Sequence, residues 1–241
     1  MRKTAVVTGA SGCIGEACAR ILASRGWCVA AAANSSPEKA DALCREIRSC
    51  GFECSVFTAD LRKSSEAEKL MGNVKKAYGG IDAVVMCAGT DLRKLIADTS
   101  DRDWEEVISS NLSTVFYTMR AAVPHMLERG GAIVAFSSIW GTAGGSAEAA
   151  YSAAKAGVEG LVRAAAKELG PSGITVNCVA PGAIESPMNS FMTEEEKQSF
   201  CEDVPLGRFG TPEEAALAAA DLLENRYVTG QVIGVNGGYV I

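Results

Sequence analysis

Short apolar runs alternate with longer helical patterns along the whole chain of 241 residues. The runs do not alternate polar with apolar positions, which is typical of strands buried on both faces of a sheet. The longer patterns carry helix signals, such as proline in the first turn at Pro37 or glycine at the end at Gly26 and Gly51. Strands are expected at residues 5–7, 27–33, 52–58, 82–87, 132–137, 174–179 and 231–235, with helices at 14–24, 37–50, 64–78, 101–128, 149–169 and from 211 onward.

This order of elements predicts an α/β fold with a parallel sheet and helices on both of its faces. No low-complexity linker and no long repeat divides the chain, so we expect one domain over residues 1–241. The segment 182–208 is an exception to the alternation. It follows the carboxyl end of a strand and carries Met188, Phe191 and Met192, which suits an apolar substrate lid.

The charge balance narrows the range of partners. Lys and Arg total 23 and Asp and Glu total 29, and no basic tail is present, so nucleic acid is not an expected partner. No apolar run approaches the roughly 18 residues of a membrane-spanning helix, so we expect no membrane partner. His125 is the single histidine, and a histidine-based zinc site or a Ser-His-Asp triad would depend on it. We expect no metal.

Nine cysteines are a high and odd number. No C-x-x-C pair occurs, and no signal peptide precedes the first strand. We therefore expect a cytoplasmic protein whose cysteines are small buried hydrophobic residues in a reducing compartment. A zinc cluster or a redox pair is the alternative. The cysteines are Cys13, Cys18, Cys28, Cys44, Cys50, Cys54, Cys87, Cys178 and Cys201.

A glycine-rich turn joins the first strand to the first helix. Its glycines are spaced G-x-x-G-x-x-G, which differs from the G-x-G-x-x-G dinucleotide fingerprint. Such a turn lets the backbone approach a pyrophosphate, which then lies at the helix N-terminus. A plain strand-to-helix turn is the alternative, although the position after an N-terminal strand favours cofactor binding. The expected contacts are Gly9, Ser11, Gly12, Cys13, Ile14 and Gly15.

The residues after the second strand bear on the choice of cofactor. An acidic residue there would hold the ribose 2′-hydroxyl of NAD and repel the 2′-phosphate of NADP. The strand ends in Asn34 and Ser35 with no acidic residue, and both side chains can donate hydrogen bonds to a phosphate. No arginine lies in this turn to clamp it. We expect NADP(H) to be preferred over NAD(H).

Three residues further along the chain suggest acid-base chemistry. Tyr151 and Lys155 lie four positions apart and share one helix face. An adjacent ammonium lowers the pKa of a phenol, which can then exchange a proton with a carbonyl oxygen. Ser138, at the carboxyl end of a strand, can hydrogen-bond the same oxygen. A packed tyrosine beside a solvated lysine is the alternative reading of this spacing.

Together these residues resemble the short-chain dehydrogenase/reductase family over the whole chain. The resemblance implies a seven-stranded Rossmann sheet, a nicotinamide cofactor and a homotetramer. Ser138, Tyr151 and Lys155 match the family's catalytic residues, and Asn111 matches the asparagine that completes a proton relay with Lys155 and water. Beyond the glycine-rich turn, the implied cofactor contacts are Asp60, Leu61, Ala88, Gly89, Tyr151, Lys155, Pro181, Gly182, Ile184 and Ser186.

The chain departs from the family pattern near the cofactor. Cys13 occupies the second small position of the turn, and Met86-Cys87 replace two asparagines before Ala88. A cysteine side chain in the turn would crowd the pyrophosphate, so we expect reduced cofactor affinity. A nicotinamide-nucleotide-binding protein without turnover is therefore one alternative function.

Within the family, the chain is similar to bacterial 3-oxoacyl-[acyl-carrier-protein] reductases. The expected function is NADPH-dependent reduction of a small or carrier-bound ketone to a secondary alcohol. A carrier protein is acidic, so a basic residue is expected near the pocket, and Arg129 fits that role. A reductase of the 5-aminopentanone group on elongation factor P, or another alcohol, sugar or steroid dehydrogenase, is the alternative. The apolar chain end, Val240-Ile241, agrees with a homotetramer.

Overall fold

The structure is a computed structural model, and it describes residues 2–187 and 192–241. Within these residues, seven parallel strands form one sheet in the order β3-β2-β1-β4-β5-β6-β7. The strands are β1 (Thr4–Thr8), β2 (Cys28–Ala33), β3 (Cys54–Thr58), β4 (Ala83–Met86), β5 (Gly131–Phe136), β6 (Ile174–Pro181) and β7 (Val232–Val235). The predicted seven-stranded Rossmann sheet is therefore confirmed.

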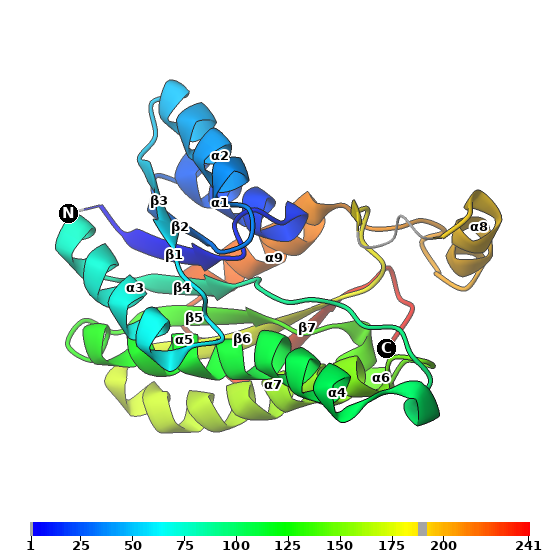
Figure 1. Cartoon of the computed structure of the whole chain (residues 1–241). Helices are drawn as coiled ribbons and strands as arrows, with labels where there is room; N and C mark the ends of the chain where they lie inside the picture. The colour runs from blue at the N-terminus through cyan, green and yellow to red at the C-terminus, as the bar shows by residue number, and fades with distance from the viewer. Residues whose placement is uncertain (1, 188–191) are drawn as a thin grey trace.

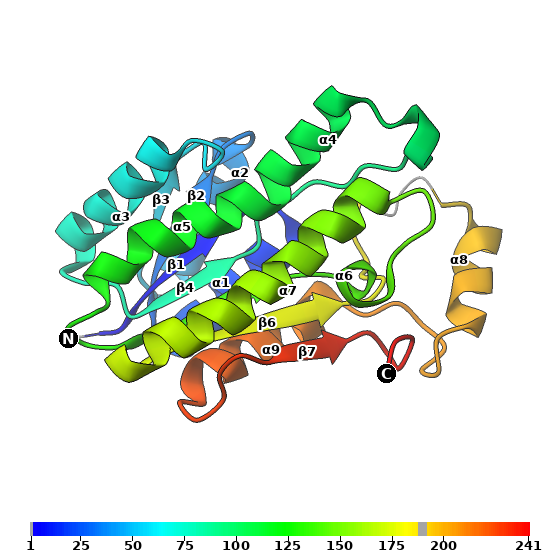
Figure 2. The same ribbon diagram turned by 90° about the horizontal axis from the view of Figure 1, so that it is seen from below.

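Helices cover both faces of the sheet (Figure 1). One layer consists of α1 (Cys13–Ser24), α2 (Pro37–Ser49) and α9 (Pro212–Glu224). The other consists of α3 (Ser64–Tyr78), α4 (Asp101–Ile108), α5 (Thr114–Ala122) and α7 (Ala149–Leu169). Figure 2 shows α3, α5 and α7 side by side across that second face. Each layer packs on its own apolar core, which explains why residues of β1, β2, β5 and β6 are buried whichever way they point.

The sheet reverses its winding between β1 and β4. The chain builds outward from β1 to β3 and then crosses back to place β4 on the other side of β1. In open α/β sheets such a switch point opens a crevice beyond the carboxyl ends of the strands, where ligands bind. The short α6 (Ile139–Ala143) and α8 (Glu194–Glu202) lie at this end, and α8 stands away from the sheet in Figures 1 and 2.

Two segments differ from the predicted elements. The helix expected at 101–128 is divided by a π-helical turn at Ser109–Ser113, and it ends in a 3₁₀ turn at Val123–His125 that contains a proline. The segment 182–208 contains α8, which begins with a reciprocal cap between Thr193 and Glu196. Met188 and Phe191 of the predicted lid lie outside the described residues.

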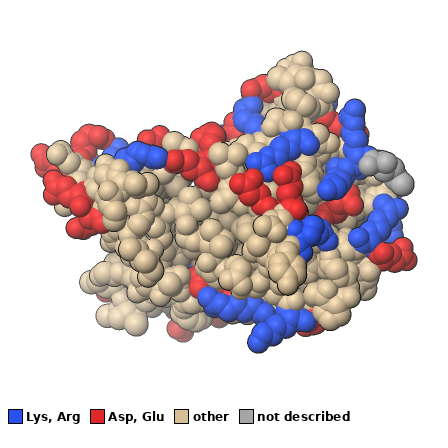
Figure 3. All heavy atoms as spheres, turned by 180° about the vertical axis from the view of Figure 1, so that it is seen from behind, with Lys and Arg blue, Asp and Glu red and all other residues tan. Residues whose placement is uncertain are grey.

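Two further features of the fold are the length and apolarity of its helices and the distribution of charge on its surface. Among the described residues, no helix combines the length and apolarity needed to cross a bilayer. On the face shown in Figure 3, basic side chains lie among acidic ones, with uncharged surface between them.

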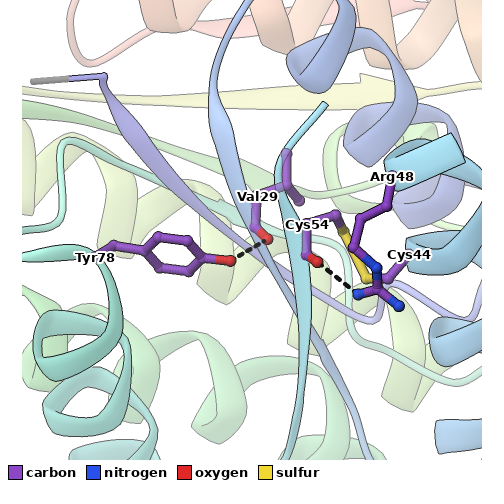
Figure 4. Close-up of a disulfide and its surroundings, with 5 residues drawn as sticks. All are labelled: Val29, Cys44, Arg48, Cys54 and Tyr78. Carbon is purple, nitrogen blue, oxygen red and sulfur yellow. Dashed lines mark hydrogen bonds between the residues drawn. A yellow bond between two sulfur atoms is a disulfide. The ribbon is translucent and has the colours of Figure 1, made fainter. Parts of the chain in front are cut away.

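Two cysteines depart from the expectation that the cysteines are reduced. Cys44 of α2 and Cys54 of β3 form a disulfide, and both are buried (Figure 4). Their Cα atoms lie 5.1 Å apart, within the range that a disulfide spans. The prediction failed because the two positions meet only when α2 packs on the sheet. Cys18, Cys28 and Cys178 are buried free thiols, as expected, whereas Cys50 is exposed.

The disulfide predicts a measurable contribution to stability. Cys44→Ala should lower the free energy of unfolding by about 2–3 kcal/mol, because the bridge restricts a short loop in the unfolded chain. Urea denaturation without reductant measures this loss. Cys50→Ser, at an exposed cysteine between the bridged pair, is the control and should change the value by less than about 0.5 kcal/mol. A wild-type protein that is equally stable with and without dithiothreitol would contradict the prediction.

Candidate active site

A cavity of about 820 Å³ lies at the carboxyl ends of the strands. Its walls come from the glycine-rich turn after β1, the loop after β4, the end of β5, the first turns of α7 and the segment after β6. The cavity brings together residues that the sequence placed far apart. The predicted site residues that line it are Ser11, Gly12, Cys13, Ile14, Gly89, Asn111, Ser138, Tyr151, Lys155, Pro181, Gly182, Ile184 and Ser186.

The glycine-rich turn lines the end of the cavity where the sequence predicts a cofactor. Gly9 has a φ of 65°, and a Cβ there would lie 2.7 Å from the backbone nitrogen of Ala88. Gly12 donates a 2.9 Å hydrogen bond to the carbonyl of Gly9 and is the N-cap of α1. The N-cap residue Gly12 has no side chain to cap the first turn of α1, so the N–H groups of that turn can receive an anion. The turn therefore fits a pyrophosphate, with Gly9, Gly15 and Ala88 packing beneath the lining residues.

Two cysteines line the same end of the cavity. Cys13 is the first residue of α1, and burial raises the pKa of its thiol. Burial also raises the pKa of Cys87, whose sulfur lies 4.0 Å from that of Cys18. Both side chains are thus neutral thiols at pH 7, so they add bulk without charge. The expected loss of cofactor affinity stays a prediction.

The remaining predicted cofactor residues lie outside the cavity lining. Asn34 and Ser35 follow β2 and are exposed, and Leu61 is buried. Asp60 accepts a 2.9 Å hydrogen bond from Nε of Arg62, which holds the pKa of the carboxyl below its usual range.

Sequence reasoning missed Lys39, the third residue of α2, which lines the cavity. The sequence feature that could have identified Lys39 is a cationic residue in the first turn of the helix after the second strand. Lys39 places a positive charge on the cavity wall, whereas the Asn34–Ser35 turn carries none.

Tyr151 and Lys155 lie on α7, where Tyr151 is half-buried and Lys155 is buried. Nζ of Lys155 lies 5.5 Å from the centre of the Tyr151 ring and donates a 3.0 Å hydrogen bond to the carbonyl of Phe136. Burial lowers the pKa of Lys155 to about 8. Burial raises the pKa of Tyr151 well above its usual value near 10, and the charge of Asp91 raises it further. The predicted lowering of the tyrosine pKa is therefore wrong, because burial and the charges of Asp91 and Glu148 raise it.

The two neighbouring serines after β5 have different surroundings. Ser138 is the N-cap of α6, where its hydroxyl accepts a 3.2 Å hydrogen bond from the backbone N–H of Trp140. A hydrogen bond with Ser138 also works against the rise in the pKa of Tyr151. Ser137 instead donates to the carbonyl of Lys155 and to Glu159, each at 3.1 Å. Ser138 is therefore the serine that adjoins the tyrosine.

Asn111 lies in the π-helical turn between α4 and α5. Its Nδ2 donates to the carbonyls of Thr90 and Val107 at 2.9 and 3.0 Å, and its Oδ1 accepts a 3.2 Å bond from the N–H of Thr90. These bonds hold the loop after β4 against α4. A Cβ on Gly89 would lie 2.6 Å from Oδ1 of Asn111, so only glycine fits there without displacement. π-helical turns occur often at functional sites, and this one brings Asn111 to the cavity.

Charged residues of the cavity wall also escaped the sequence analysis. Asp91, Arg93 and Glu148 line the cavity on the side of Tyr151. Arg129, expected beside the pocket, lies instead next to Lys3 and Thr4 at the other end of the sheet. The reason is its place in the chain, because it directly precedes the amino end of β5, whereas the cavity lies at the carboxyl end.

This fold and this cavity define an oxidoreductase that acts on carbonyl or alcohol groups. A family model described as "Enoyl-(Acyl carrier protein) reductase" matches residues 9–240. The chain belongs to the short-chain dehydrogenase/reductase family. Family membership implies a nicotinamide cofactor and favours an enzyme over a binding protein without turnover.

Individual relatives agree with this assignment. The chain is 40% identical to a 3-oxoacyl-[acyl-carrier-protein] reductase FabG of Staphylococcus epidermidis, over 99% of both chains. It is 38% identical to the uncharacterized oxidoreductase YmfI of Bacillus subtilis, again over 99% of both. A solved dehydrogenase/reductase from Sinorhizobium meliloti 1021 superposes with a TM-score of 0.94 at 33% identity, covering 99% of this chain and 95% of the other.

The packing around Gly89 yields a prediction. Gly89→Ala should displace Asn111 and weaken binding of the nicotinamide cofactor about tenfold, because overpacking of this kind costs about 1–3 kcal/mol. Fluorescence titration of NADPH measures the change. Gly72→Ala is the control, since open space surrounds that glycine in α3, and it should stabilise the protein by up to about 1 kcal/mol. Unchanged NADPH affinity in Gly89→Ala would refute the assigned packing role.

Proposed function

We propose that the protein uses NADPH to reduce a ketone to a secondary alcohol, as a 3-oxoacyl-[acyl-carrier-protein] reductase does. The observation that carries the proposal is the convergence of Tyr151, Ser138 and Lys155 on one cavity with the glycine-rich turn. The likeness to FabG of Staphylococcus epidermidis supports the substrate class. Reduction of an acetoacetyl thioester, followed by NADPH absorbance, tests it.

The cofactor end of the cavity is suited to a dinucleotide. The first turn of α1 would hold the pyrophosphate, while Asn34, Ser35 and Lys39 would hold the 2′-phosphate. Pro181, Gly182, Ile184 and Ser186 would lie beside the nicotinamide. A nicotinamide held there would supply the hydride. Asp60, Leu61 and Ala88 complete the proposed contacts with the adenosine half.

The protein's own residues transfer the proton to the carbonyl oxygen. Tyr151 donates its phenolic proton to the carbonyl oxygen, and its raised pKa keeps that proton in place until the oxygen becomes strongly basic. Ser138 donates a hydrogen bond to the same oxygen. Lys155 returns a proton toward Tyr151, because its pKa near 8 brings its own titration close to neutral pH. Asn111 positions the loop around this relay and, with water, links it to solvent.

The Tyr151→Phe variant tests directly whether Tyr151 is the proton donor. Loss of the phenolic proton should lower kcat on the acetoacetyl thioester by about 10²- to 10⁴-fold. NADPH affinity should stay within about twofold, since the ring remains in place. Tyr227→Phe, at a fully exposed tyrosine, is the control. Wild-type turnover in Tyr151→Phe would exclude the mechanism.

Substitution of Lys39 tests the proposed preference for NADPH over NADH. Lys39→Ala should raise KM for NADPH about tenfold, the value of one charge-assisted hydrogen bond, and leave KM for NADH almost unchanged. Lys76→Ala on the exposed face of α3 serves as the matched control. Equal effects on both cofactors would show that Lys39 does not read the 2′-phosphate.

The proposal extends to the assembly and the cellular location. We propose a homotetramer in the cytoplasm, with 182–208 as the substrate lid of a single domain. Exposed apolar side chains on α4, α5 and β7 support assembly, namely Trp104, Phe116 and Ile233. The position of Pro187, Met192 and Phe200 on the cavity wall supports the lid.

A further inference from the structure

Glu159 is a buried carboxylate on α7 that the proposed mechanism does not use. It lies one helical turn after Lys155, its side chain is only 5% exposed, and it does not line the cavity. A carboxylate in such a place is costly unless hydrogen bonds and a cation compensate it. Glu159 has both kinds of partner, and its hydrogen bonds reach toward the reacting residues.

The hydrogen bonds of Glu159 go to residues on both sides of Ser138. Oε1 of Glu159 accepts one from Oγ of Ser137 at 3.1 Å and one from Oγ1 of Thr142 at 3.0 Å. Ser137 directly precedes Ser138, while Thr142 lies in α6, the helix that Ser138 caps. We call Glu159, Ser137 and Thr142 the Glu159 clamp. One carboxylate oxygen thus ties both flanks of Ser138 to α7.

Arg163 supplies the compensating charge from the solvent side. Its Nη2 lies 3.2 Å from Oε2 of Glu159, the oxygen that the two hydroxyls do not contact, and its side chain is 55% exposed. The guanidinium therefore balances the charge of the carboxylate, while Oε1 stays available to the two hydroxyls.

The packing at Gly141 limits the movement of the Glu159 clamp. A Cβ on Gly141 would lie 2.5 Å from Oγ of Ser137 and 2.9 Å from Oε1 of Glu159. A side chain would fit there only if the clamp opened. The turn between β5 and α6 therefore has little freedom to move.

The clamped turn also carries contacts of the reacting residues. The carbonyl of Phe136 accepts the hydrogen bond from Nζ of Lys155, and Oγ of Ser137 lies 3.1 Å from the carbonyl oxygen of Lys155. The hydroxyl of Ser138 is the one that adjoins Tyr151. A shift of the turn would move Ser138 relative to Tyr151, and a misplacement of about 1 Å can lower a rate about 100-fold.

We propose that Glu159 is a positioning residue, which holds the hydroxyl of Ser138 where it can hydrogen-bond the carbonyl oxygen of the substrate. This inference rests on the proposed ketone reduction and adds to it a residue that touches neither substrate nor cofactor. Glu159 acts through Ser137 and Thr142. Loss of the clamp should lower kcat and leave cofactor binding nearly unchanged, because the glycine-rich turn forms another part of the cavity wall.

Two substitutions of Glu159 separate its hydrogen bonds from its charge. Glu159→Leu removes both hydrogen bonds and should lower kcat on the acetoacetyl thioester about 10- to 100-fold, with KM for NADPH within about twofold. Glu159→Gln keeps an acceptor oxygen for both hydroxyls and should retain at least about half of the wild-type kcat. Glu168→Leu, at an exposed position in the last turn of α7, is the control. Full activity of Glu159→Leu, or an equal loss in Glu159→Gln, would overturn the inference.

A double-mutant cycle shows whether Glu159 acts through Ser138. Ser138→Ala removes the hydroxyl that the clamp positions, so the addition of Glu159→Leu to Ser138→Ala should lower kcat by less than about twofold. General damage to the fold would lower kcat by the same factor in either background. A fully additive loss would therefore overturn the inference.

Thr142 gives a variant of the clamp that spares the core. Thr142 is exposed, and Thr142→Val should lower kcat about three- to tenfold, because it removes one of the two hydrogen bonds. Thr142→Ser keeps the hydroxyl and should restore kcat. An unchanged kcat in Thr142→Val would contradict the proposed role of the clamp.

Amide hydrogen exchange tests the clamp without turnover. The N–H of Trp140 donates to Oγ of Ser138, so peptides that cover α6 should exchange at least about tenfold faster in Glu159→Leu and at the wild-type rate in Glu159→Gln. A wild-type protein that reduces no ketone, together with this difference in exchange, would remove the reductase proposal and keep the positioning of Ser138 by Glu159. Ketone reduction with equal exchange rates in both variants would do the reverse.

Discussion

The close packing at Gly9, against backbone, and at Gly89, against a side chain, is the constraint on which the site depends. At Gly9 a side chain would collide with Ala88, and at Gly89 it would collide with Asn111. These contacts bring the start of α1, the end of β4 and the π-helical turn to one point at the switch of the sheet. An anion at the helix start and a carbonyl near Tyr151 can then share one cavity.

Burial controls the protonation of the residues around that cavity. It lowers the pKa of Lys155 and raises those of Tyr151 and Glu148. All three shifts favour the neutral form, as expected where charge is poorly solvated. The site is therefore arranged to hold protons on its acids until a substrate or cofactor changes the local charge.

The alternation of apolar runs and helical patterns was sufficient to predict the sheet and both helical layers. Local spacing also brought Tyr151 and Lys155 together, because four residues on one helix share a face. The Cys44–Cys54 bridge and the meeting of Arg93 with Glu148 on the cavity wall were beyond such reasoning, since these residues meet only after distant elements pack. The direction of the Tyr151 pKa shift was mispredicted for the same reason, because burial is a property of the folded molecule. The roles of the individual site residues stay predictions.

The hydrogen bond from Arg48 to Cys54 has a consequence for the rim of the sheet. Strand β3 is an outer strand, and the carbonyl of Glu53 bonds inward to Val29 of β2. The next carbonyl along, that of Cys54, accepts a 2.8 Å bond from Nη1 of Arg48 (Figure 4). An incoming strand from another molecule would have to displace this guanidinium before it paired there. Arg48 thus protects one margin of the sheet from strand-to-strand aggregation.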